Sequence, residues 1–234
     1  EIYNRKNEIM RTEFKLDSDK RNKFMKLSTT NISDALDALG LKGSTFGIRP
    51  MWESVDKVVG QAVTVKLISA GLSKSRHHLG INAIAAASPG DVILIDNSGR
   101  LDTSCWGGIL SHAAKMKGVS GVVIDGACRD VDDCIDAEFS VYARGSVVAT
   151  ARGRIMEDET NVMVQFGGVQ VRPGDIVFGD KSGVVIVPKE MSEQVLAKAQ
   201  QLFEKEENMV ADIKSGMSII EVDKKYNYEK MLKS

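Results

Sequence analysis

Residues 105–133 read CWGGILSHAAKMKGVSGVVIDGACRDVDD, and this stretch decides the fold. Two glycines open a segment with the apolar spacing of a helix, and Gly118 follows as a residue that typically ends one. The apolar run at 122–124 then leads into an Asp-Gly turn. We therefore predict a helix over 107–117, a strand over 122–124 and, after the strand, a turn rich in charged side chains.

Short β-branched runs separated by glycine and aspartate continue on both sides of this stretch, over residues 58–187. Such runs, bounded by turn-forming residues, are typical of strands, whereas the alanine-rich run before Pro89 is typical of a helix. The predicted strands lie at 58–68, 92–95, 122–124, 141–143, 162–165, 169–171, 176–178 and 184–187. The predicted helices lie at 82–88, 107–117 and 135–139.

One unit of sequence occurs twice, as PGDVILIDNSG at 89–99 and as PGDIVFGDKSG at 173–183. Pro-Gly-Asp favours a tight turn before each strand, and Asp-x-Ser-Gly favours a second turn after it. The first strand should therefore end at 96–99. We interpret both copies as hairpin scaffolding without a chemical role.

Helical spacing also marks the segments that precede the strand-rich region. Residues 1–27 alternate charged and apolar side chains, and several N-cap residues at 28–34 precede a short helix that Gly40 ends. The candidate anchors of the first segment are Ile9, Phe14, Phe24 and Leu27.

After Pro188 the chain becomes charged and amphipathic over 189–214, and Gly216 separates this helix from a short helical tail. A helix of this kind packs on its own domain or on a neighbouring subunit, and its charged face stays solvated. The residues on its apolar face are Val195, Leu196, Ala199, Leu202 and Phe203. The chain thus divides into an N-terminal helical extension at 1–27, a domain at 28–190 and a C-terminal helical tail at 191–234.

Composition excludes several classes of protein. The formal net charge of -1 provides no long-range field for nucleic acid or an anionic membrane, and no apolar run is long enough to span a bilayer. Three cysteines without a CxxC pair favour buried, reduced thiols in a cytoplasmic protein. Three histidines without HExxH spacing argue against a histidine-rich zinc enzyme. The residues concerned are Cys105, Cys128, Cys134, His77, His78 and His112.

Two parts of the central stretch carry groups suited to chemistry. Gly107 and Gly108 leave the N–H groups at a helix start unobstructed, which suits a small carboxylate or phosphate, although a plain glycine turn explains them too. Arg129 can pair with a carboxylate or polarise a keto oxygen. Asp130 and Asp133 offer hard oxygen ligands for Mg²⁺ or Mn²⁺. The same acids could instead form a surface ion cluster that caps a helix over 132–138.

Several motifs together resemble the RraA-like family. They are WGGxLxxAA at 106–114, GVxGVVIDGxxRD at 118–130, SDALD at 33–37, GxAVTV at 60–65, PGDVILID at 89–96, FxVYARG at 139–145 and VxFGGVxVxPGD at 164–175. The resemblance covers roughly residues 28–190. The family includes class II aldolases that act on 4-hydroxy-4-methyl-2-oxoglutarate and 4-carboxy-4-hydroxy-2-oxoadipate, with oxaloacetate decarboxylation through the same enolate. It also includes a regulator that inhibits a ribonuclease by contact and has no established catalysis.

The resemblance implies an α/β fold: a layered β/β/α domain, swivelling and phosphohistidine-domain-like, with flanking N- and C-terminal helices. It also implies a homotrimer or homohexamer in which a neighbouring tail contributes an acid to the site, from among Glu204, Glu206 and Glu207. Asp130 is implied to bind a divalent metal, Mg²⁺ or Mn²⁺, partly through waters. Arg129 is implied to contact the carboxylate and keto oxygen of a small 2-oxo acid. The backbone that cradles the carboxylate is implied to be that of Gly107, Gly108, Ile109 and Leu110.

One departure from the aldolase pattern concerns Gly108, where active aldolases of the family carry an aspartate that helps to hold the metal's waters. A second version of the family pattern has glycine there and an acid three residues after Asp130. We therefore expect Asp133 to substitute as a catalytic acid. Related proteins have also been labelled methyltransferases, but no GxGxG loop follows a strand here. Trp106 is expected in the core and not as a stacking platform.

Overall fold

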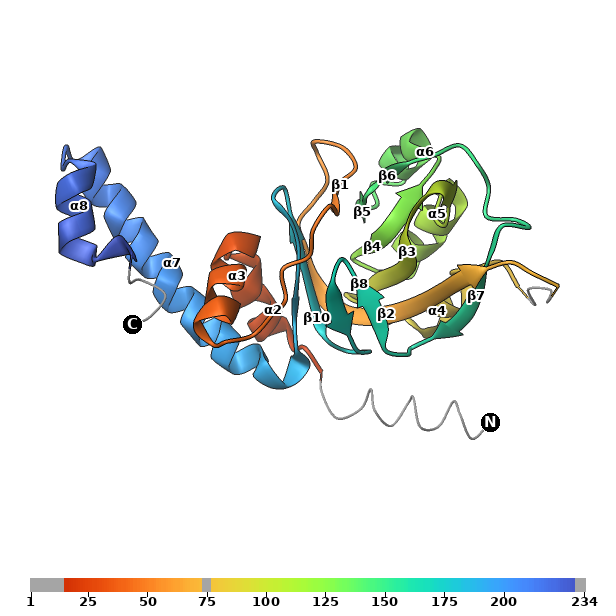
Figure 1. The fold of residues 1–234 in the computed structure, drawn as a ribbon, viewed down its shortest axis with the longest axis horizontal. Coiled ribbons are helices and arrows are strands. Elements are labelled where there is room, and N and C mark those ends of the chain that lie inside the picture. The colour runs from red at the N-terminus through yellow and green to blue at the C-terminus, as the bar shows by residue number, and fades with distance from the viewer. Residues whose placement is uncertain (1–14, 73–76, 230–234) are drawn as a thin grey trace.

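A computed structural model describes residues 15–72 and 77–229 of the chain. Figure 1 shows a curved sheet with helices packed around it and a long helix extending to one side. The candidate anchors Ile9 and Phe14 lie outside the described residues. The helices are α2 (Ser18–Met25), α3 (Thr29–Ala38), α4 (Ile81–Ala86), α5 (Gly108–Met116), α6 (Val131–Asp136), the 3-10 helix η1 (Lys189–Met191), α7 (Ser192–Lys214) and α8 (Ile219–Tyr226).

The main sheet has the order β1-β5-β4-β3-β2-β10-β11, while β6 pairs with β4, and β7 with β2. Strands β2 to β5 run parallel, whereas β10, β11, β7 and β1 join antiparallel. The strands are β1 (Arg49–Pro50), β2 (Val58–Ser69), β3 (Val92–Ser104), β4 (Gly121–Cys128), β5 (Val141–Ala143), β6 (Gly145–Ser146), β7 (Ile155–Thr160), β8 (Val164–Phe166), β9 (Val169–Val171), β10 (Ile176–Asp180) and β11 (Gly183–Val187).

Strand β2 bends the sheet into a nearly closed, barrel-like surface. Its start pairs with β10, its middle with β3, and its end with β7. A strand that changes partners along its length must twist strongly, and this twist curls the sheet. The α/β class is therefore confirmed, whereas the swivelling, phosphohistidine-domain-like description and the three-part division of the chain stay predictions.

Apolar side chains fill three clusters around the sheet. The first lies between β2–β5 and helices α4, α5 and α6, and includes Trp106 and Phe139, whose stacked rings lie 6.0 Å apart. The second joins β10 and β11 to α2, α3 and α7. The third fills the inside of the curved sheet beneath β8 and β9, and includes Tyr142 and Phe166. Trp106 is 2 % exposed, so its expected place in the core is confirmed.

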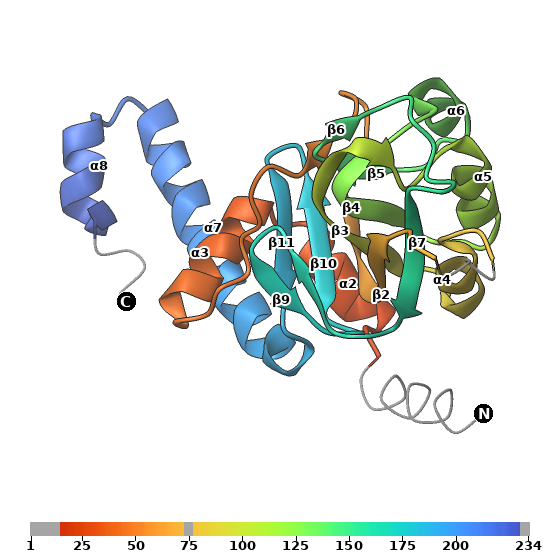
Figure 2. The same ribbon diagram turned by 45° about the vertical axis from the view of Figure 1, so that its right-hand side comes forward.

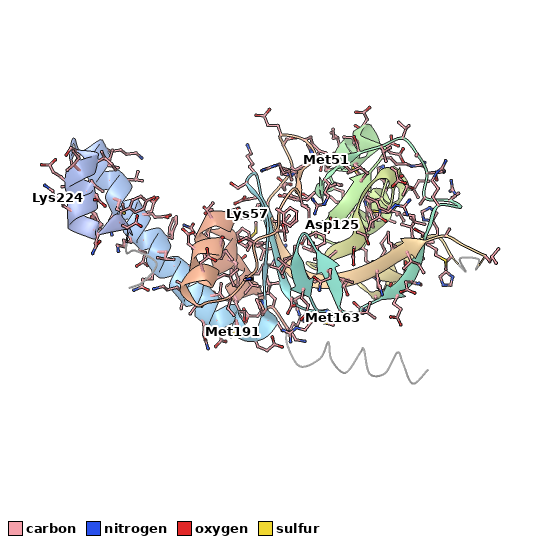
Figure 3. All side chains as sticks on the ribbon, in the orientation of Figure 1. Met51, Lys57, Asp125, Met163, Met191 and Lys224 are labelled. Carbon is pink, nitrogen blue, oxygen red and sulfur yellow. The ribbon has the colours of Figure 1, made fainter. Side chains whose placement is uncertain are left out.

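Two of the predicted strands, β3 and β4, are longer by five residues or more than the sequence indicated. Strand β3 was expected to turn back at 96–99, but it continues to Ser104 and stays paired with β4. Ser98 and Gly99 have φ values of 54° and 71°, so the expected turn is a kink within one long strand. Strand β4 likewise runs on to Cys128, which places Asp125 inside the sheet, near the centre of the view in Figure 3.

The two copies of the repeated unit share their local bonds but differ in their connections. Asp91 accepts from the backbone N–H of Ser88, and Asp175 accepts in the same way from Arg172, each at 2.8 Å. The second copy forms the antiparallel β10–β11 hairpin, as predicted. The first copy forms no hairpin, because β3 lies parallel to both of its neighbours. The hairpin prediction is therefore wrong for 89–99.

The flanking helices follow the predicted pattern where the structure describes them. Phe24 and Leu27 are buried, Ser28 caps α3 in a capping box with Asn31, and Gly40 has a φ of 69°. Helix α7 packs on α3, and α8 folds back on α7 (Figure 2). The predicted apolar face of α7 is buried apart from the partly exposed Phe203. Within the described residues, no helix has the length and apolar character that a membrane crossing requires.

Candidate active site

The start of helix α5 forms one wall of the candidate site. Gly107 precedes the helix in an extended conformation, and a Cβ atom there would lie 2.6 Å from the Oδ2 atom of Asp130. A side chain would therefore push Asp130 away, so the glycine is required for this close approach. The indole Nε1 of Trp106 donates to the Ser111 hydroxyl at 2.9 Å, which ties the first turn of α5 to the core.

Asp130 directs its carboxylate at this helix start. The residue has φ 51° and ψ 47°, a left-handed conformation that aspartate tolerates better than most residues. It precedes α6 but makes no side-chain bond that caps this helix. Its Oδ2 atom instead accepts from the backbone N–H of Gly108 at 3.4 Å and lies 3.2 Å from the Nε atom of Arg129. The alternative that Asp130 merely caps α6 is thus not supported.

Asp133 occupies the space that a side chain at position 108 would need. A Cβ atom on Gly108 would lie 2.4 Å from the Cβ and 2.9 Å from the Oδ2 of Asp133. Asp133 lies in the first turn of α6 and is exposed. The structure therefore places the acid of position 133 against the position where the aldolase pattern has its acid.

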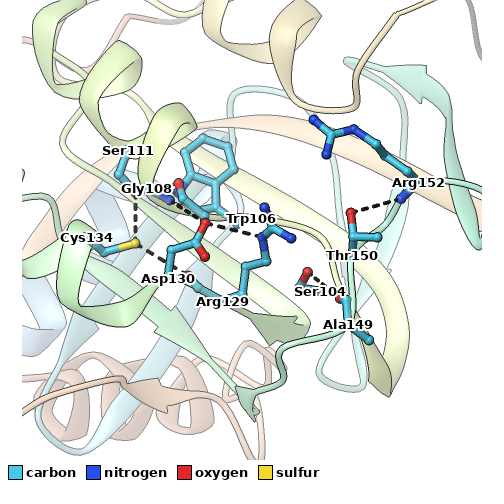
Figure 4. A network of polar contacts seen from close by, with 11 residues as sticks. Ser104, Trp106, Gly108, Ser111, Arg129, Asp130, Cys134, Ala149, Thr150 and Arg152 are labelled. Atoms are coloured by element: carbon cyan, nitrogen blue, oxygen red, sulfur yellow. Dashed lines mark hydrogen bonds and ion pairs between the residues drawn. The ribbon is translucent and has the colours of Figure 1, made fainter.

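A cavity of about 400 Å³ lies beside these residues, and Figure 4 shows the polar contacts along its edge. Arg129 and Asp130 line it, and their side chains are 34 % and 35 % exposed. Of the predicted cradle, Gly107, Ile109 and Leu110 line the cavity, whereas Gly108 lies behind them against Asp133. The residues that complete the lining are His78, Ile81, Ile84, Ser104, Cys105, Trp106, Ala113, Thr150, Ala151 and Arg152.

Sequence reasoning missed the wall that includes His78, Thr150 and Arg152. These residues lie far from the central stretch in sequence and carry no motif of their own. The backbone brings Thr150 and Arg152 close, because the N–H of Ser104 donates to the carbonyl of Ala149 at 3.0 Å. The sequence contained no signal for this contact, since Ser104 was expected to lie beyond the end of a short strand.

The cysteines do not supply a nucleophile. Cys105, Cys128 and Cys134 are buried and free. Burial raises the pKa of Cys105 and Cys134, and raises that of Cys128 to about 12. A thiol with a raised pKa is protonated at neutral pH and therefore a poor nucleophile. The prediction that these cysteines are buried is confirmed, whereas their reduced state stays a prediction.

The acids of the site suit a hard divalent cation. Asp130 and Asp133 both present carboxylate oxygens near the start of α5. Among the described residues, no group of three or more His, Cys, Asp or Glu side chains could hold a metal ion. Mg²⁺ needs no such group, because it keeps several waters and often takes only one or two protein carboxylates. The donor set therefore fits Mg²⁺ or Mn²⁺ better than zinc.

Comparison with known proteins decides the family. Residues 29–186 match the RraA-like family, described as Aldolase/RraA. The chain belongs to the RraA-like family. A protein of Halalkalibacterium halodurans named "Putative 4-hydroxy-4-methyl-2-oxoglutarate aldolase" is 39 % identical over 178 residues, which cover 76 % of this chain and 80 % of that protein.

Other relatives extend the likeness. Protein DlpA of Legionella pneumophila is 30 % identical over 202 residues, which cover 86 % of this chain but only 33 % of that protein. An uncharacterised protein of Pseudomonas syringae has a crystal structure with a TM-score of 0.81 at 30 % identity, covering 89 % of this chain and 98 % of that one. A Streptomyces coelicolor protein, titled an unusual member of the RNase ES inhibitor RraA family, has a TM-score of 0.75 at 24 % identity, covering 83 % and 96 %. That likeness shows the fold alone.

Proposed function

We propose that this RraA-like protein is a divalent-metal-dependent class II aldolase. It cleaves a 4-hydroxy-2-oxo diacid to pyruvate and decarboxylates oxaloacetate as a side activity. The observation that supports this most strongly is the position of Asp130. Its carboxylate is turned away from its own helix, lies beside Arg129 and is partly exposed on a cavity wall. The name of the Halalkalibacterium halodurans relative supports the same reaction.

In this proposal Asp130 holds Mg²⁺ or Mn²⁺ partly through waters, and Asp133 helps to hold those waters. When bound, such an ion supplies a Lewis acid that polarises the 2-keto oxygen and stabilises an enolate. Both carboxylates lie at the positive end of the α5 dipole, where a negative side chain is favoured.

The chain's own residues bind and orient the substrate. Arg129 pairs with the 1-carboxylate and with the keto oxygen through its forked donors. The N–H groups of Gly107, Ile109 and Leu110, which line the cavity at the start of α5, complete the carboxylate cradle. The N–H of Gly108 donates to Asp130. The apolar wall formed by Ile84 and Trp106 excludes water, which strengthens these charge interactions.

Cleavage then follows the retro-aldol course. The 4-hydroxyl loses its proton, the C3–C4 bond breaks, and its electron pair forms the enolate of pyruvate, which takes a proton at C3. Asp133 lies against Gly108, outside the cavity lining, and is exposed. We therefore assign the acceptance of the hydroxyl proton to Asp133 acting through a water. Arg129 stabilises the negative charge of the enolate.

The proposal includes a cytoplasmic homotrimer or homohexamer that binds neither nucleic acid nor a membrane, in which a neighbouring tail completes the site. Glu206 accepts from the Asn31 side chain of its own chain at 2.7 Å and is partly buried. Glu204 and Glu207 are exposed. We therefore favour Glu204 or Glu207 as the acid offered to a neighbour.

A second candidate function is a non-catalytic regulator that binds a ribonuclease or another protein. The observation that favours it is Gly108, which leaves the aldolase position without its acid. The two candidates differ in whether the purified protein turns over substrate.

The test is pyruvate release from oxaloacetate and from 4-hydroxy-4-methyl-2-oxoglutarate, with Mg²⁺ or Mn²⁺ and then with EDTA. We expect activity that EDTA abolishes and that excess Mn²⁺ restores. The Asp130→Ala variant should lose about 10²–10³-fold in kcat, the scale of losing a main electrostatic contact to the transition state. Full activity in this variant, or in EDTA, would refute the proposal.

A further inference from the structure

A second arginine lies on the candidate cavity. Arg152, His78 and Ala151 line this cavity and also an adjoining hollow of about 310 Å³. Arg129 and Asp130 line the first space but not the second. Arg152 therefore stands where the cavity meets the hollow, away from the cluster at the start of α5. In Figure 4 the side chains of Arg129 and Arg152 reach toward each other from separate segments.

The segment that carries Arg152 is firmly held. The hydroxyl of Thr103 donates to the carbonyl of Thr150 at 3.2 Å, and the N–H of Arg154 donates to the carbonyl of Ala151 at 2.9 Å. Ala151 itself is only 6 % exposed. The backbone on both sides of Arg152 is thus fixed to β3 and to its own turn, so that a flexible side chain projects from a rigid base.

The charge of Arg152 is not neutralised by the described part of the chain. Within residues 15–72 and 77–229, no carboxylate forms an ion pair with its guanidinium, whereas Arg100 pairs with Asp102 and Arg144 with Asp125. The cavity lining contains two arginines and a single acid, Asp130. Its net positive charge favours an anionic ligand that carries more than one negative group.

We propose that Arg152 determines specificity by binding a second carboxylate of the substrate. This inference rests on the proposed function, in which Arg129 binds the carboxylate beside the keto group. Ile81, Ile84 and Ala113 line the space, which suits the hydrocarbon between two carboxylates. The preferred class of ligand is therefore a 2-oxo acid with a carboxylate at its far end, and a 2-oxo monoacid binds less well. The guanidinium fork suits this role, because it pairs with a carboxylate through two parallel bonds.

The test uses two ligands that differ only in the far group: 2-oxoglutarate, a diacid, and 2-oxopentanoate, a monoacid with the same number of carbons. Calorimetry in the presence of Mg²⁺ measures the Kd of each. We expect wild-type protein to bind 2-oxoglutarate more tightly. The Arg152→Ala variant should weaken that binding about 10- to 100-fold, as expected for loss of a charged hydrogen bond, and should leave 2-oxopentanoate nearly unchanged.

Two variants serve as controls. Arg152→Lys keeps the charge without the fork and should lose only part of the preference. Lys181→Ala makes the same change in net charge at an exposed turn between β10 and β11, remote from the cavity lining, and should change neither Kd. A melting curve for each variant checks that the fold is kept.

The outcomes separate this inference from the aldolase proposal. Equal weakening of both ligands in Arg152→Ala, no weakening of either, or no binding of 2-oxoglutarate by wild-type protein would overturn the role of Arg152. Selective weakening in a protein that releases no pyruvate would support the diacid site and refute the aldolase. Pyruvate release without selective weakening would support the aldolase and refute the diacid site.

Discussion

Gly108 and Asp133 compete for one space, and this competition can be measured. A Gly108→Asp substitution places its Cβ 2.4 Å from the Cβ of Asp133, which forces one of the two side chains to move. We expect the single variant to lose about 1–3 kcal/mol of unfolding free energy, as overpacked sites do. The double variant Gly108→Asp with Asp133→Gly removes the clash and should regain most of this loss in urea unfolding.

The same pair of variants tests the catalytic role of Asp133. If the acid at position 133 replaces the one that the aldolase pattern has at 108, the double variant should release pyruvate faster than Asp133→Gly alone. Aspartate in the first turn of α5 is also favoured by the helix dipole, which helps the double variant to fold. Equal rates in the two variants would show that Asp133 has no such role.

Cys105 should resist alkylation even though it lines the cavity. It is 2 % exposed, its thiol donates weakly to the carbonyl of Ala127, and burial raises its pKa. A raised pKa means that the reactive thiolate forms only at a pH above that of an ordinary cysteine, about 8.5. Mass spectrometry after iodoacetamide treatment at pH 8 should find Cys105 unmodified in folded protein and modified in urea. Rapid labelling of folded protein would contradict this.

At the level of strands, Asp125 joins the main sheet to the segment that follows β5 and to the separate β8–β9 hairpin. This residue of β4 is 7 % exposed and forms an ion pair with Arg144, which follows β5. Its carboxylate also accepts from the N–H of Gly167, in the turn between β8 and β9, at 2.7 Å. Replacing Asp125 with alanine leaves the largely buried Arg144 without its partner. We expect a loss of about 3–5 kcal/mol in the free energy of unfolding, the cost of breaking a buried pair.

An exposed pair on the neighbouring strand provides the control for this prediction. Asp102 of β3 pairs with Arg100, and both side chains are in contact with solvent. Asp102→Ala should change the free energy of unfolding very little, since exposed ion pairs contribute little. If chemical denaturation finds the two variants equally stable, Asp125 does not tie these elements together.

The sequence correctly predicted those elements that have a clear apolar pattern and turn-forming residues at their ends. Helix α5 and strand β5 lie where their spacing placed them, because each is bounded by turn residues. Strand β7, at Ile155–Thr160, was missed because its sequence, IMEDET, has no clear alternation of apolar and polar residues. It pairs with β2 at the edge of the sheet, where solvent accepts charged side chains.

The residues of the candidate site also fall into those that a local sequence motif predicts and those that it does not. Arg129 and Asp130 are adjacent in sequence, so one motif could reveal both. Their closeness to Gly107 follows from a helix and a strand that are also near in sequence. Arg152 meets the cavity only because β3 passes through its kink and pairs with the segment at 149–150. A contact made by a bent strand across long sequence separation leaves no local signal.

At the scale of the whole molecule, the described residues form a curved sheet with helices packed around it, from which α7 and α8 extend as a helical arm. Helix α7 spans 23 residues, or about 34 Å, and α3 covers only part of it. Its apolar side chains are buried as far as Met209, and α8 then folds back on its last turns. Val210, Ile213, Ile219 and Ile220 are between 42 % and 65 % exposed. The arm therefore carries more exposed apolar surface than a solvated helix needs.

Such surface is expected to be covered when copies of the chain assemble, in line with the proposed homotrimer or homohexamer. Light scattering during gel filtration should give three or six times the 25.5 kDa of one chain. Ile219→Asp with Ile220→Asp places charge on the arm, remote from the core clusters, and should shift the mass toward the monomer while the melting of the sheet domain is kept. Lys224→Asp, a charge change on the same helix, serves as the control and should leave the mass unaltered. If Glu204 or Glu207 of a neighbour completes the site, the monomeric variant should also lose pyruvate release. A wild-type protein that is monomeric at micromolar concentration would remove the basis for a shared site.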